Sequence, residues 1–399
     1  MIYYAVLGYG TVGSGVAEVM AEQKEKIRRL VGEEVELKYI LVRHSYPGDP
    51  HGDKMVMDFS VIENDPEVSI VAEVIGGIGD AYEYSKRALR AGKSLVSSNK
   101  ELVAVHGAEL NEIAREKGVC YLFEGSVGGG IPLLRPLTQC LAANRIDEVF
   151  GILNGTTNYI LTAMDARGQS FQEALADAQR LGYAEADPTA DVEGIDACRK
   201  TAILADLSFG WNMDPRAIPT RGITAVTTAD LELAHALGYT VKLLGRAIRT
   251  EGGCCAFVEP HLIPMTHLLA SVSGVMNACV VRGSAVGEVM FYGPGTGKRP
   301  TASAVAGDIV EAAQRRSFRK DTDLGRPGGV LAPANALESR WYVRMEADPE
   351  EITAVFPEAE PVYGSSWECG FLTTSMARDG LEERLARLPG EAAVLRVLA

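Results

Sequence analysis

The densest group of residues that could do chemistry lies in segment 182–200, with the sequence GYAEADPTADVEGIDACRK. It holds five acids in what the pattern predicts to be a loop leading into a helix. Asp196 and Lys200 are four residues apart, so they would lie on one helical face, and the apolar stretch 201–207 could turn that face inward. A partly buried lysine beside a carboxylate can relay a proton to a substrate oxygen. On spacing alone, a solvated salt bridge explains the pair equally well.

Two polar turns follow predicted strands and could contact a small ligand. Segment 151–159, GILNGTTNY, runs from a strand into a turn rich in hydroxyl and amide groups. Asn154 to Thr157 could bind a polar ligand or cap the next helix. Segment 97–100, SSNK, falls at the carboxyl edge of the predicted sheet, where ligands bind in open α/β folds. Lys100 is there either a surface charge or a reaction-centre cation.

A glycine cluster, FEGSVGGGIP at 123–132, follows an apolar strand. Such a run exposes backbone carbonyl and N–H groups and permits unusual backbone angles. With Glu124 beside it, the cluster could ligate a hard cation through oxygen atoms. The alternative is a hinge between domains.

The turn Gly8-Tyr9-Gly10-Thr11-Val12-Gly13 has the pattern G-x-G-x-x-G, directly after a predicted strand and at the start of a helix. The first glycine allows the tight turn, the second lets the backbone approach a pyrophosphate, and the third lets helix and strand pack closely. The helix N-terminus then offers N–H groups to the phosphates. We therefore expect a dinucleotide site. Arg43 follows the second strand, and the next carboxylate in sequence is Asp49. An arginine without an adjacent acid at this position favours NADP over NAD.

The first third of the chain predicts the elements that position these residues. Uncharged strands alternate with helices, which is typical of a parallel sheet covered on both faces. We expect strands at 2–8, 35–42, 70–75, 94–97 and 120–123, one long helix from Val12 through Ile27, and helices at 81–91 and 102–117.

The rest of the chain predicts two further parts. Apolar runs at 254–264 and 278–292 indicate strands and a hairpin, in an α+β domain that could also carry a subunit contact. Segment 321–337 is rich in glycine and proline and is predicted to be a linker. The last 60 or so residues alternate as strand, helix, strand, strand, helix, strand.

Composition excludes several classes of protein. The chain has 399 residues, enough for two or three domains, and a net charge of −14, which argues against nucleic acid or an anionic membrane as partner. The seven cysteines are scattered and form no C-x-x-C pair, so the sequence predicts neither a disulfide framework nor a structural zinc site. We expect free, buried cysteines in a reducing cytoplasm. The start, MIYYAVLGYG, lacks the basic residues of a signal peptide. Segment 260–281 contains no Asp, Glu, Lys or Arg, but its prolines and histidines make it a poor membrane span.

Taken together, these motifs closely resemble the homoserine dehydrogenase family. The late segments YGPGTG at 292–297 and PTASAV at 300–305 match that family's late glycine loop. The resemblance covers about residues 1–320, and the pattern GYxExDP…D…GxDxxxK within 182–200 is far more specific than G-x-G-x-x-G. It implies a Rossmann-type nucleotide domain and the interconversion of L-homoserine and L-aspartate 4-semialdehyde with NAD(P), on the path to threonine and methionine.

The resemblance also implies roles for individual residues. Lys200, Lys100 and Asp196 would be catalytic, because one lysine that changes protonation can serve both directions and a second can fix the electrostatics. The substrate would contact Glu185, Asp191, Tyr183, Gly155 and Thr156. The cofactor, NADP or NAD, would contact Gly8, Gly10, Thr11, Val12, Gly13, Arg43, Gly76, Asn99 and Gly297. A monovalent cation such as sodium or potassium would be held by Glu124 and by backbone oxygens of Val127, Gly129 and Ile131.

These implications give a domain plan. We expect a nucleotide domain at 1–135, completed by a returning helix at about 300–320, a substrate and dimerisation domain at 136–299, the linker at 321–337, and a βαββαβ domain at 338–399. That order resembles a small ferredoxin-like, ACT-type regulatory domain. ACT domains usually carry glycine after the proline of the first turn, whereas this chain has Asp348-Pro349-Glu350-Glu351. An amino-acid effector site and a structural or oligomerising role both stay open, and a homodimer or tetramer is expected.

Two rival functions stay open. One is another amino-acid or semialdehyde dehydrogenase with the same frame, although acylating oxidation would need an activated cysteine in a loop. The other is a regulator that senses the dinucleotide without turning it over. The 182–200 segment would have no purpose in such a sensor, and no DNA-reading helix is evident.

Overall fold

The computed structural model describes residues 1–251, 253–315, 317, 324–327, 329–364 and 368–398. The chain divides into two compact units, each built from separate segments. The first unit contains Met1–Ile146, Ala202–Pro215 and Val281–Gly329, and the second contains Asp147–Thr201, Arg216–Val280 and Val330–Ala399.

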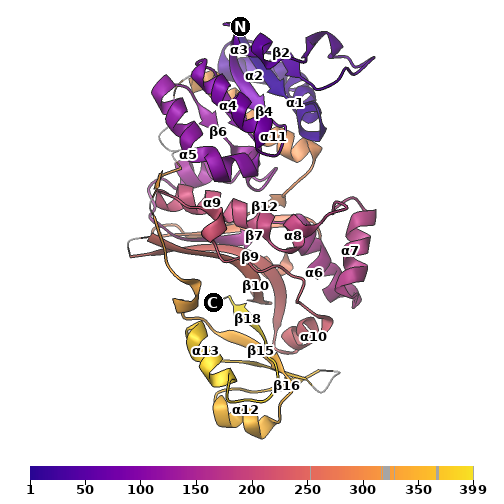
Figure 1. Ribbon diagram of the computed structural model, residues 1–399, viewed down its shortest axis with the longest axis vertical. Helices are drawn as coiled ribbons and strands as arrows, with labels where there is room; N and C mark the ends of the chain where they lie inside the picture. The colour runs from indigo at the N-terminus through magenta and orange to yellow at the C-terminus, as the bar shows by residue number, and fades with distance from the viewer. Residues whose placement is uncertain (252, 316, 318–323, 328, 365–367, 399) are drawn as a thin grey trace. The chain divides into compact units, whose positions relative to one another are not determined.

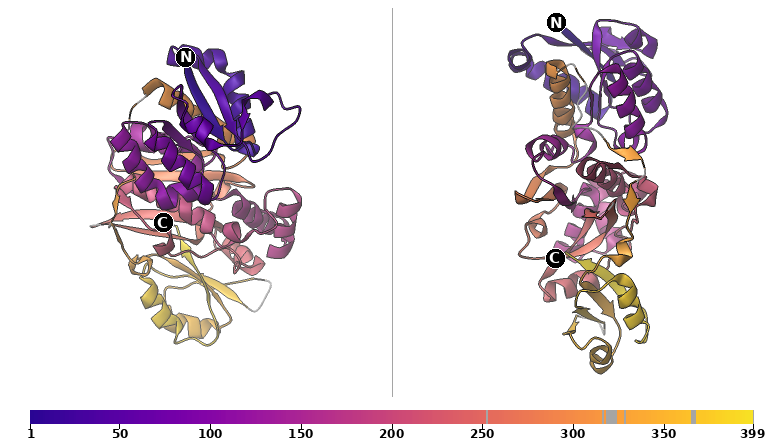
Figure 2. Two further views of the ribbon diagram at one scale, coloured as in Figure 1. Left: turned by 45° about the horizontal axis from the view of Figure 1, so that its top comes forward. Right: turned by 90° about the vertical axis from the view of Figure 1, so that its left-hand side faces the viewer.

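The first unit is built on a six-stranded sheet in the order β3-β2-β1-β4-β5-β6, in which every neighbouring pair is parallel. The predicted Rossmann-type sheet is therefore confirmed. Helices cover both of its faces, with α11 on one side and α4 and α5 on the other (Figures 1 and 2). The strands are β1 (Ile2–Leu7), β2 (Val35–Leu41), β3 (Met55–Val56), β4 (Val68–Glu73), β5 (Ser94–Ser97) and β6 (Tyr121–Leu122). The helices are α1 (Thr11–Glu22), α2 (Lys24–Val31), α3 (Phe59–Glu63), α4 (Gly79–Arg90), α5 (Lys100–Lys117) and α11 (Lys298–Arg315).

The core of this unit explains why α11 belongs to it although it comes late in the chain. Val305, Ile309 and Ala312 of α11 are at most 1% exposed and share one apolar cluster with the strands and with α1. α11 thus fills a place on the sheet that neither α1 nor α2 covers.

Three details differ from the expected elements. The long helix predicted from Val12 to Ile27 is broken at Gln23, which ends α1 and precedes α2. β3 and α3 were not predicted, because a two-residue strand and a five-residue helix are too short to show periodicity. The strand predicted at 70–75 is β4, which ends at Glu73 because the Glu73 carboxylate accepts the Ile75 N–H at 2.8 Å and bends the chain into a loop.

A second, mixed sheet has the order β12-β11-β7-β9-β10-β18-β15-β17-β16, with β14 beside β10. Its longest members, β9 (Tyr239–Thr250) and β10 (Gly253–Pro264), form an antiparallel hairpin. The predicted strands at 254–264 and 278–292 are found, whereas β9 was not expected. The other strands before the tail are β7 (Ile146–Ile152), β11 (Met276–Gly283), β12 (Gly287–Pro294) and β14 (Val330–Leu331), and the helices are α6 (Gly155–Arg167), α7 (Phe171–Arg180), α8 (Thr189–Val192), α9 (Ile195–Phe209) and α10 (Thr228–Ala236).

The tail has the predicted order of elements. It consists of β15 (Trp341–Met345), α12 (Pro349–Val355), β16 (Val362–Tyr363), β17 (Cys369–Leu372), α13 (Arg378–Leu385) and β18 (Ala393–Val397). Its four strands are antiparallel in the order β18-β15-β17-β16, as in a ferredoxin-like fold, over an apolar core of its own. β18 also pairs in parallel with β10, so this C-terminal module continues the larger sheet. Of the predicted linker, 321–323 and 328 lie outside the described residues, and the remainder includes β13 (Arg326–Pro327), β14 and a turn of 3-10 helix at Ala334–Ala336.

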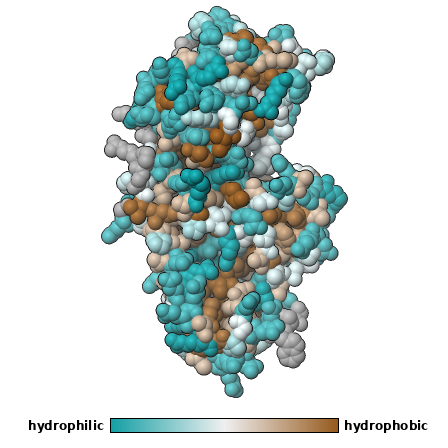
Figure 3. All heavy atoms as spheres, in the orientation of Figure 1, coloured by the Kyte–Doolittle hydropathy of each residue, from teal (hydrophilic) through white to brown (hydrophobic). Residues whose placement is uncertain are grey.

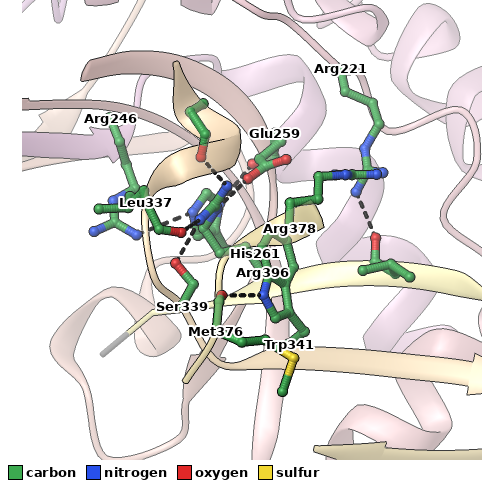
Figure 4. Close-up of polar contacts among 12 residues, drawn as sticks. Arg221, Arg246, Glu259, His261, Leu337, Ser339, Trp341, Met376, Arg378 and Arg396 are labelled. Carbon is green, nitrogen blue, oxygen red and sulfur yellow. Dashed lines mark hydrogen bonds and ion pairs between the residues drawn. The ribbon is translucent and has the colours of Figure 1, made fainter. Parts of the chain in front are cut away.

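A buried arginine joins the C-terminal module to β10 (Figure 4). Arg396 of β18 is 1% exposed, and its Nε donates to the Glu259 carboxylate of β10 at 2.6 Å. Its Nη1 donates to the Ser339 hydroxyl at 2.6 Å, and its guanidinium lies 4.8 Å from the Phe257 ring centroid and 4.4 Å from that of Trp341. The positive charge is therefore paired, hydrogen-bonded and enclosed by aromatic faces, as a buried guanidinium requires.

Among the described residues, no helix is both long enough and apolar enough to cross a membrane. On the face drawn in Figure 3, hydrophobic residues form separate patches among hydrophilic ones.

Candidate active site

The polar turn after β7 lies at the centre of a buried group in the second unit. β7 ends at Ile152, and Asn154 is the N-cap residue of α6, its side-chain oxygen accepting the Thr157 N–H at 2.8 Å. Asp191 belongs to the short helix α8, and Asp196 and Lys200 belong to α9. The two segments predicted from motifs, 151–159 and 182–200, thus meet at one place.

Asp196 and Lys200 form a buried ion pair. The Lys200 Nζ lies 2.7 Å from the Asp196 Oδ2, and their side chains are 5% and 4% exposed. The same Nζ donates to the Leu153 carbonyl oxygen at 2.7 Å. Spacing alone allowed either an inward or a solvated pair, and the structure shows the inward one, beside the buried Ala197 and Thr201 of the same helix. A buried pair of this kind can hold a proton at a defined atom.

The Asn154 side chain joins the two acids. Its Nδ2 donates to the Asp191 Oδ1 at 2.7 Å and to the Asp196 Oδ2 at 2.9 Å. Asp191, predicted to contact substrate, is therefore beside the Asp196–Lys200 pair. Sequence reasoning proposed Asn154 as a ligand contact or a cap, but not as the connection between two carboxylates.

The other predicted substrate residues lie around the start of α6 and the following loop. The Thr156 hydroxyl donates to the Tyr183 carbonyl oxygen at 2.8 Å, and the Tyr183 and Tyr159 rings lie 5.0 Å apart. A Cβ on Gly155 would lie 2.7 Å from the Val275 carbonyl oxygen, so this position requires glycine. Glu185 is exposed, and within the described part of the chain its carboxylate is not among the groups bonded to Lys200, Asp191 or Asp196.

The predicted phosphate-binding turn in the first unit has the expected geometry. Gly8 has φ +98°, in the region that favours glycine, and a Cβ on Gly13 would lie 2.0 Å from the Gly8 carbonyl oxygen. A Cβ on Gly10 would point into open space. α1 begins at Thr11, so the N–H groups of Thr11 and Val12 are at a helix N-terminus. The turn fits a pyrophosphate.

A cavity of about 440 Å³ lies beside this turn and is lined by residues from the carboxyl ends of β1, β2 and β4. Arg43 lines it, with its side chain 80% exposed, and its Nη2 donates to the Asp80 Oδ2 at 3.0 Å. The sequence showed no acid near Arg43, and this expectation was wrong, because the first turn of α4 brings Asp80 to it. The other lining residues are Gly8, Tyr9, Gly10, Leu41, Val42, His44, Tyr46, Met57, Val74, Ile75, Asp80 and Tyr84.

The remaining residues predicted at the cofactor lie at the ends of β4 and β5 and before α11. The buried Glu73 carboxylate, whose pKa is raised by burial, accepts the Ser97 hydroxyl at 2.7 Å and so links the two strand ends. Asn99 caps α5 and donates to the Gly77 carbonyl oxygen at 2.6 Å, next to Gly76. Lys100 is the first residue of α5 and is partly exposed. Gly297, with φ +122°, directly precedes α11.

The predicted cation loop is held by Glu124 and α11. The Glu124 carboxylate accepts the backbone N–H groups of Leu133, Leu134 and Arg135 at 2.5–2.8 Å, and its own N–H donates to Asp308 of α11 at 2.8 Å. Burial raises the pKa of Asp308 to about 7. A Cβ on Gly129 would lie 2.3 Å from the Gly295 carbonyl oxygen, so the two glycine loops touch through their backbones. Val127, Gly129 and Ile131 of this loop are buried.

A parallel sheet with this glycine turn and adjoining cavity defines a dinucleotide-binding oxidoreductase fold. Two family models match the chain: "Homoserine dehydrogenase, NAD binding domain" over residues 8–124 and "Homoserine dehydrogenase" over residues 132–310. The chain is 43% identical to a homoserine dehydrogenase of Pseudomonas aeruginosa over 354 residues, covering 86% of this chain and 81% of that protein. It is 45% identical to one of Corynebacterium glutamicum over 372 residues, covering 90% and 82%. The chain belongs to the homoserine dehydrogenase family of oxidoreductases.

Solved structures agree with this assignment. A homoserine dehydrogenase from Thiobacillus denitrificans matches with a TM-score of 0.91 at 36% identity, covering 100% of this chain and 98% of that one. A hyperthermophilic archaeal homoserine dehydrogenase in complex with NADPH matches with a TM-score of 0.67 at 29% identity, covering 78% of this chain and 97% of that one.

Proposed function

We propose that this chain, as a homoserine dehydrogenase, interconverts L-homoserine and L-aspartate 4-semialdehyde through Lys200, in the cytoplasm, on the path to threonine and methionine. The observation that supports this role most is the buried Asp196–Lys200 pair, 2.7 Å apart and bonded to the turn that begins α6. A bound nicotinamide cofactor supplies or accepts the hydride.

Lys200 is proposed to take the hydroxyl proton when homoserine is oxidised and to return it when the aldehyde is reduced. The Asp196 carboxylate stabilises the ammonium form and orients it. Lys100, the first residue of α5, is proposed as a second catalytic lysine that supplies positive charge for the reaction.

The substrate is a zwitterion, and both of its charges need partners. We assign its ammonium group to Asp191 and Glu185, because carboxylates are the groups that hold an ammonium ion. Its carboxylate is assigned to Gly155 and Thr156 at the start of α6, with Tyr183 closing that side.

The cofactor is proposed to be NADP, with NAD as an alternative. Gly8, Gly10, Thr11, Val12 and Gly13 would hold the pyrophosphate, and Arg43 would pair with a 2′-phosphate. Gly76, Asn99 and Gly297 are assigned to the remainder of the same site.

We also propose that sodium or potassium binds the loop that contains Val127, Gly129 and Ile131. Backbone carbonyls are suitable ligands for a hard cation, and the glycines permit the conformation. Because the Glu124 carboxylate already accepts three N–H groups, its part is to hold the loop in shape.

We propose nucleotide, substrate, linker and C-terminal parts at 1–135, 136–299, 321–337 and 338–399, in a homodimer or tetramer. For the ACT-like C-terminal module we favour a structural role. Asp348 caps α12 and Pro349 begins it, where an effector-binding turn would need glycine, and Arg396 fixes the module to β10.

The test is the absorbance of reduced cofactor when the full chain receives homoserine with NADP or with NAD. We expect reduction with both and faster reduction with NADP. Reduction by another amino alcohol but not by homoserine would favour the other dehydrogenase function. Binding of cofactor without reduction of either would favour the sensor.

A further inference from the structure

Asn154 lies at the centre of the buried group but has no part in the roles assigned above. We propose that Asn154 is a positioning residue for the proposed reaction: its amide holds the Asp191 and Asp196 carboxylates side by side and so fixes the Asp196–Lys200 pair. This inference rests on the proposed role of Lys200. It adds a residue that neither touches the reacting atoms nor merely caps a helix.

The amide nitrogen of Asn154 gives each carboxylate a hydrogen bond. It lies 2.7 Å from the Asp191 Oδ1 and 2.9 Å from the Asp196 Oδ2, in a side chain that is 5% exposed. Two carboxylates that share one neutral donor are held close together, whereas without it their negative charges would drive them apart. The Asp196 oxygen that accepts from Asn154 is also the one that accepts from Lys200, so moving Asn154 moves the ion pair.

The orientation of this amide is fixed by its other end. The Asn154 Oδ1 accepts the Thr157 N–H at 2.8 Å and the Thr157 hydroxyl at 3.0 Å. A flipped amide would place its NH₂ group against the Thr157 N–H, leaving two donors face to face. The cap of α6 therefore determines that the nitrogen, and not the oxygen, faces the two acids.

The same turn of chain also holds Lys200 from a second direction. The Leu153 carbonyl, one residue before Asn154, accepts from the Lys200 Nζ at 2.7 Å. Backbone and side chain of the turn at 153–154 thus contact both members of the ion pair. The start of α6 and the start of α9 are joined into one support for the lysine.

Asparagine is the residue that meets both requirements. Aspartate would cap α6 equally well but would replace the donor with a third carboxylate beside Lys200. Serine would also cap the helix, but its shorter side chain could not reach both acids. The substitution Asn154→Asp therefore separates the positioning role from the capping role.

The experiment compares the full-length wild type with Asn154→Asp in homoserine oxidation across pH. We expect the turnover number to fall about 10- to 100-fold, the loss typical of charged hydrogen bonds. The pH at which the rate rises should increase by about one unit. A third carboxylate stabilises the protonated form of Lys200 more than Asp191 and Asp196 do by themselves. The affinity for NADPH, measured by fluorescence, should stay within about twofold, because the proposed cofactor turn lies in the other unit.

The matched control is Asn158→Asp, which buries the same new carboxylate one turn further along α6. The Asn158 amide donates to the Val272 and Met276 carbonyl oxygens and accepts from Lys242, away from the two acids. It should lower the melting temperature but leave the pH dependence of the rate as in the wild type. If Asn154→Asp does not fold, Asn154→Ser takes its place. For that variant we expect a smaller loss of turnover and no shift in the pH dependence of the rate.

Three outcomes decide the matter. A wild-type rate and pH profile in Asn154→Asp would overturn the inference. An equal pH shift in Asn158→Asp would also overturn it, since any buried carboxylate on α6 would then suffice. If Lys200→Ala retains normal turnover, the proposed function of Lys200 fails instead, and this result is distinct from the first two.

Discussion

Arg43 and Asp80 form an ion pair beside the proposed cofactor cavity, with 3.0 Å between the Arg43 Nη2 and the Asp80 Oδ2. Both side chains are more than half exposed, so the pair itself contributes little stability. Its interest is functional. A 2′-phosphate that binds Arg43 would have to share the guanidinium with Asp80 or displace the Asp80 carboxylate. The two residues should therefore act in opposite directions on cofactor preference.

Removing Arg43 should therefore reduce the preference for NADP. For Arg43→Ala we expect the KM for NADP to rise about 10- to 100-fold, since a charge-assisted hydrogen bond to phosphate is lost, with the KM for NAD changed less than about threefold. Steady-state rates with both cofactors measure this directly. Faster turnover by the wild type with NAD than with NADP would contradict our interpretation of Arg43.

Removing Asp80 should have the reverse effect. Asp80→Asn keeps the size of the side chain and removes the charge that competes for Arg43, so we expect the KM for NADP to fall by about two- to fivefold, as for an exposed ion pair. The double variant Arg43→Ala/Asp80→Asn provides the control, because in it the Asp80 change should no longer matter. A fall in the KM for NAD of the same size would show that Asp80 acts on the dinucleotide in general.

Lys200→Ala tests the proposed proton transfer. We expect the turnover number to fall about 10²–10⁴-fold, the usual contribution of a positioned acid–base group, while NADPH still binds. Lys242→Ala is the matched control, because Lys242 is also a buried lysine of the second unit, with its pKa lowered by burial to about 8. It should lose stability but keep its turnover within about tenfold of the wild type. Near-normal turnover in Lys200→Ala would remove Lys200 from the mechanism.

The parts of the fold that could be predicted are those in which neighbours in sequence determine the structure. Gly8 to Gly13 form their turn because Gly8 has a positive φ and Gly13 leaves no room for a Cβ. The strands around that turn are short apolar runs, and their parallel arrangement follows from the alternation with helices. β3 and α3 escaped prediction because a two-residue strand and a five-residue helix are too short to show a periodic pattern.

The candidate site shows the same limit. The i, i+4 spacing placed Asp196 and Lys200 on one helical face, but burial of the pair depends on elements far away in sequence. Likewise, Asp80 meets Arg43, and Asp308 meets the Glu124 N–H, across long stretches of chain. The family resemblance, rather than any pattern of spacing, suggested which segments would meet around Lys200.

Removing Arg396 alone from its ion pair with Glu259 should destabilise the second unit. In Arg396→Met, the Glu259 carboxylate, whose side chain is 10% exposed, would lose its charged partner, at a cost of about 3–5 kcal/mol of unfolding free energy. The double variant Arg396→Met/Glu259→Met should recover most of this loss, because both charges are then gone. Urea unfolding followed by circular dichroism measures both.

The control for this prediction is Arg28→Met on α2, which breaks an exposed pair with Glu25. It should cost less than about 1 kcal/mol. If Arg396→Met costs no more than Arg28→Met, the arginine does not hold the C-terminal module on β10, and the structural role proposed for that module loses its main support.

His261 should make the stability of the protein depend on pH below about 6.5. Burial, together with the positive charge of Arg246, lowers the pKa of His261 well below its usual value, with smaller effects in the same direction from Arg396 and Arg221. Its Nδ1 lies 2.8 Å from the Glu259 carbonyl oxygen, and its Nε2 lies 3.4 Å from the Arg246 Nη1. A neutral ring, protonated on Nδ1 and accepting on Nε2, satisfies both contacts.

The direction of this pH dependence follows from which state, folded or unfolded, binds the proton. Below about pH 6.5 the unfolded chain protonates His261 and the folded chain does not, so the unfolding free energy falls as the pH falls, by about 1.4 kcal/mol per pH unit for this one group. His261→Gln keeps an acceptor toward Arg246 and removes the titration. Between pH 5 and 6.5, we expect the unfolding free energy of this variant to fall less steeply with falling pH than that of the wild type. The difference should be about 1.4 kcal/mol per pH unit, as measured by urea unfolding at several pH values. Parallel curves for the two proteins would mean that His261 becomes protonated inside the folded protein, which its position between arginines should prevent.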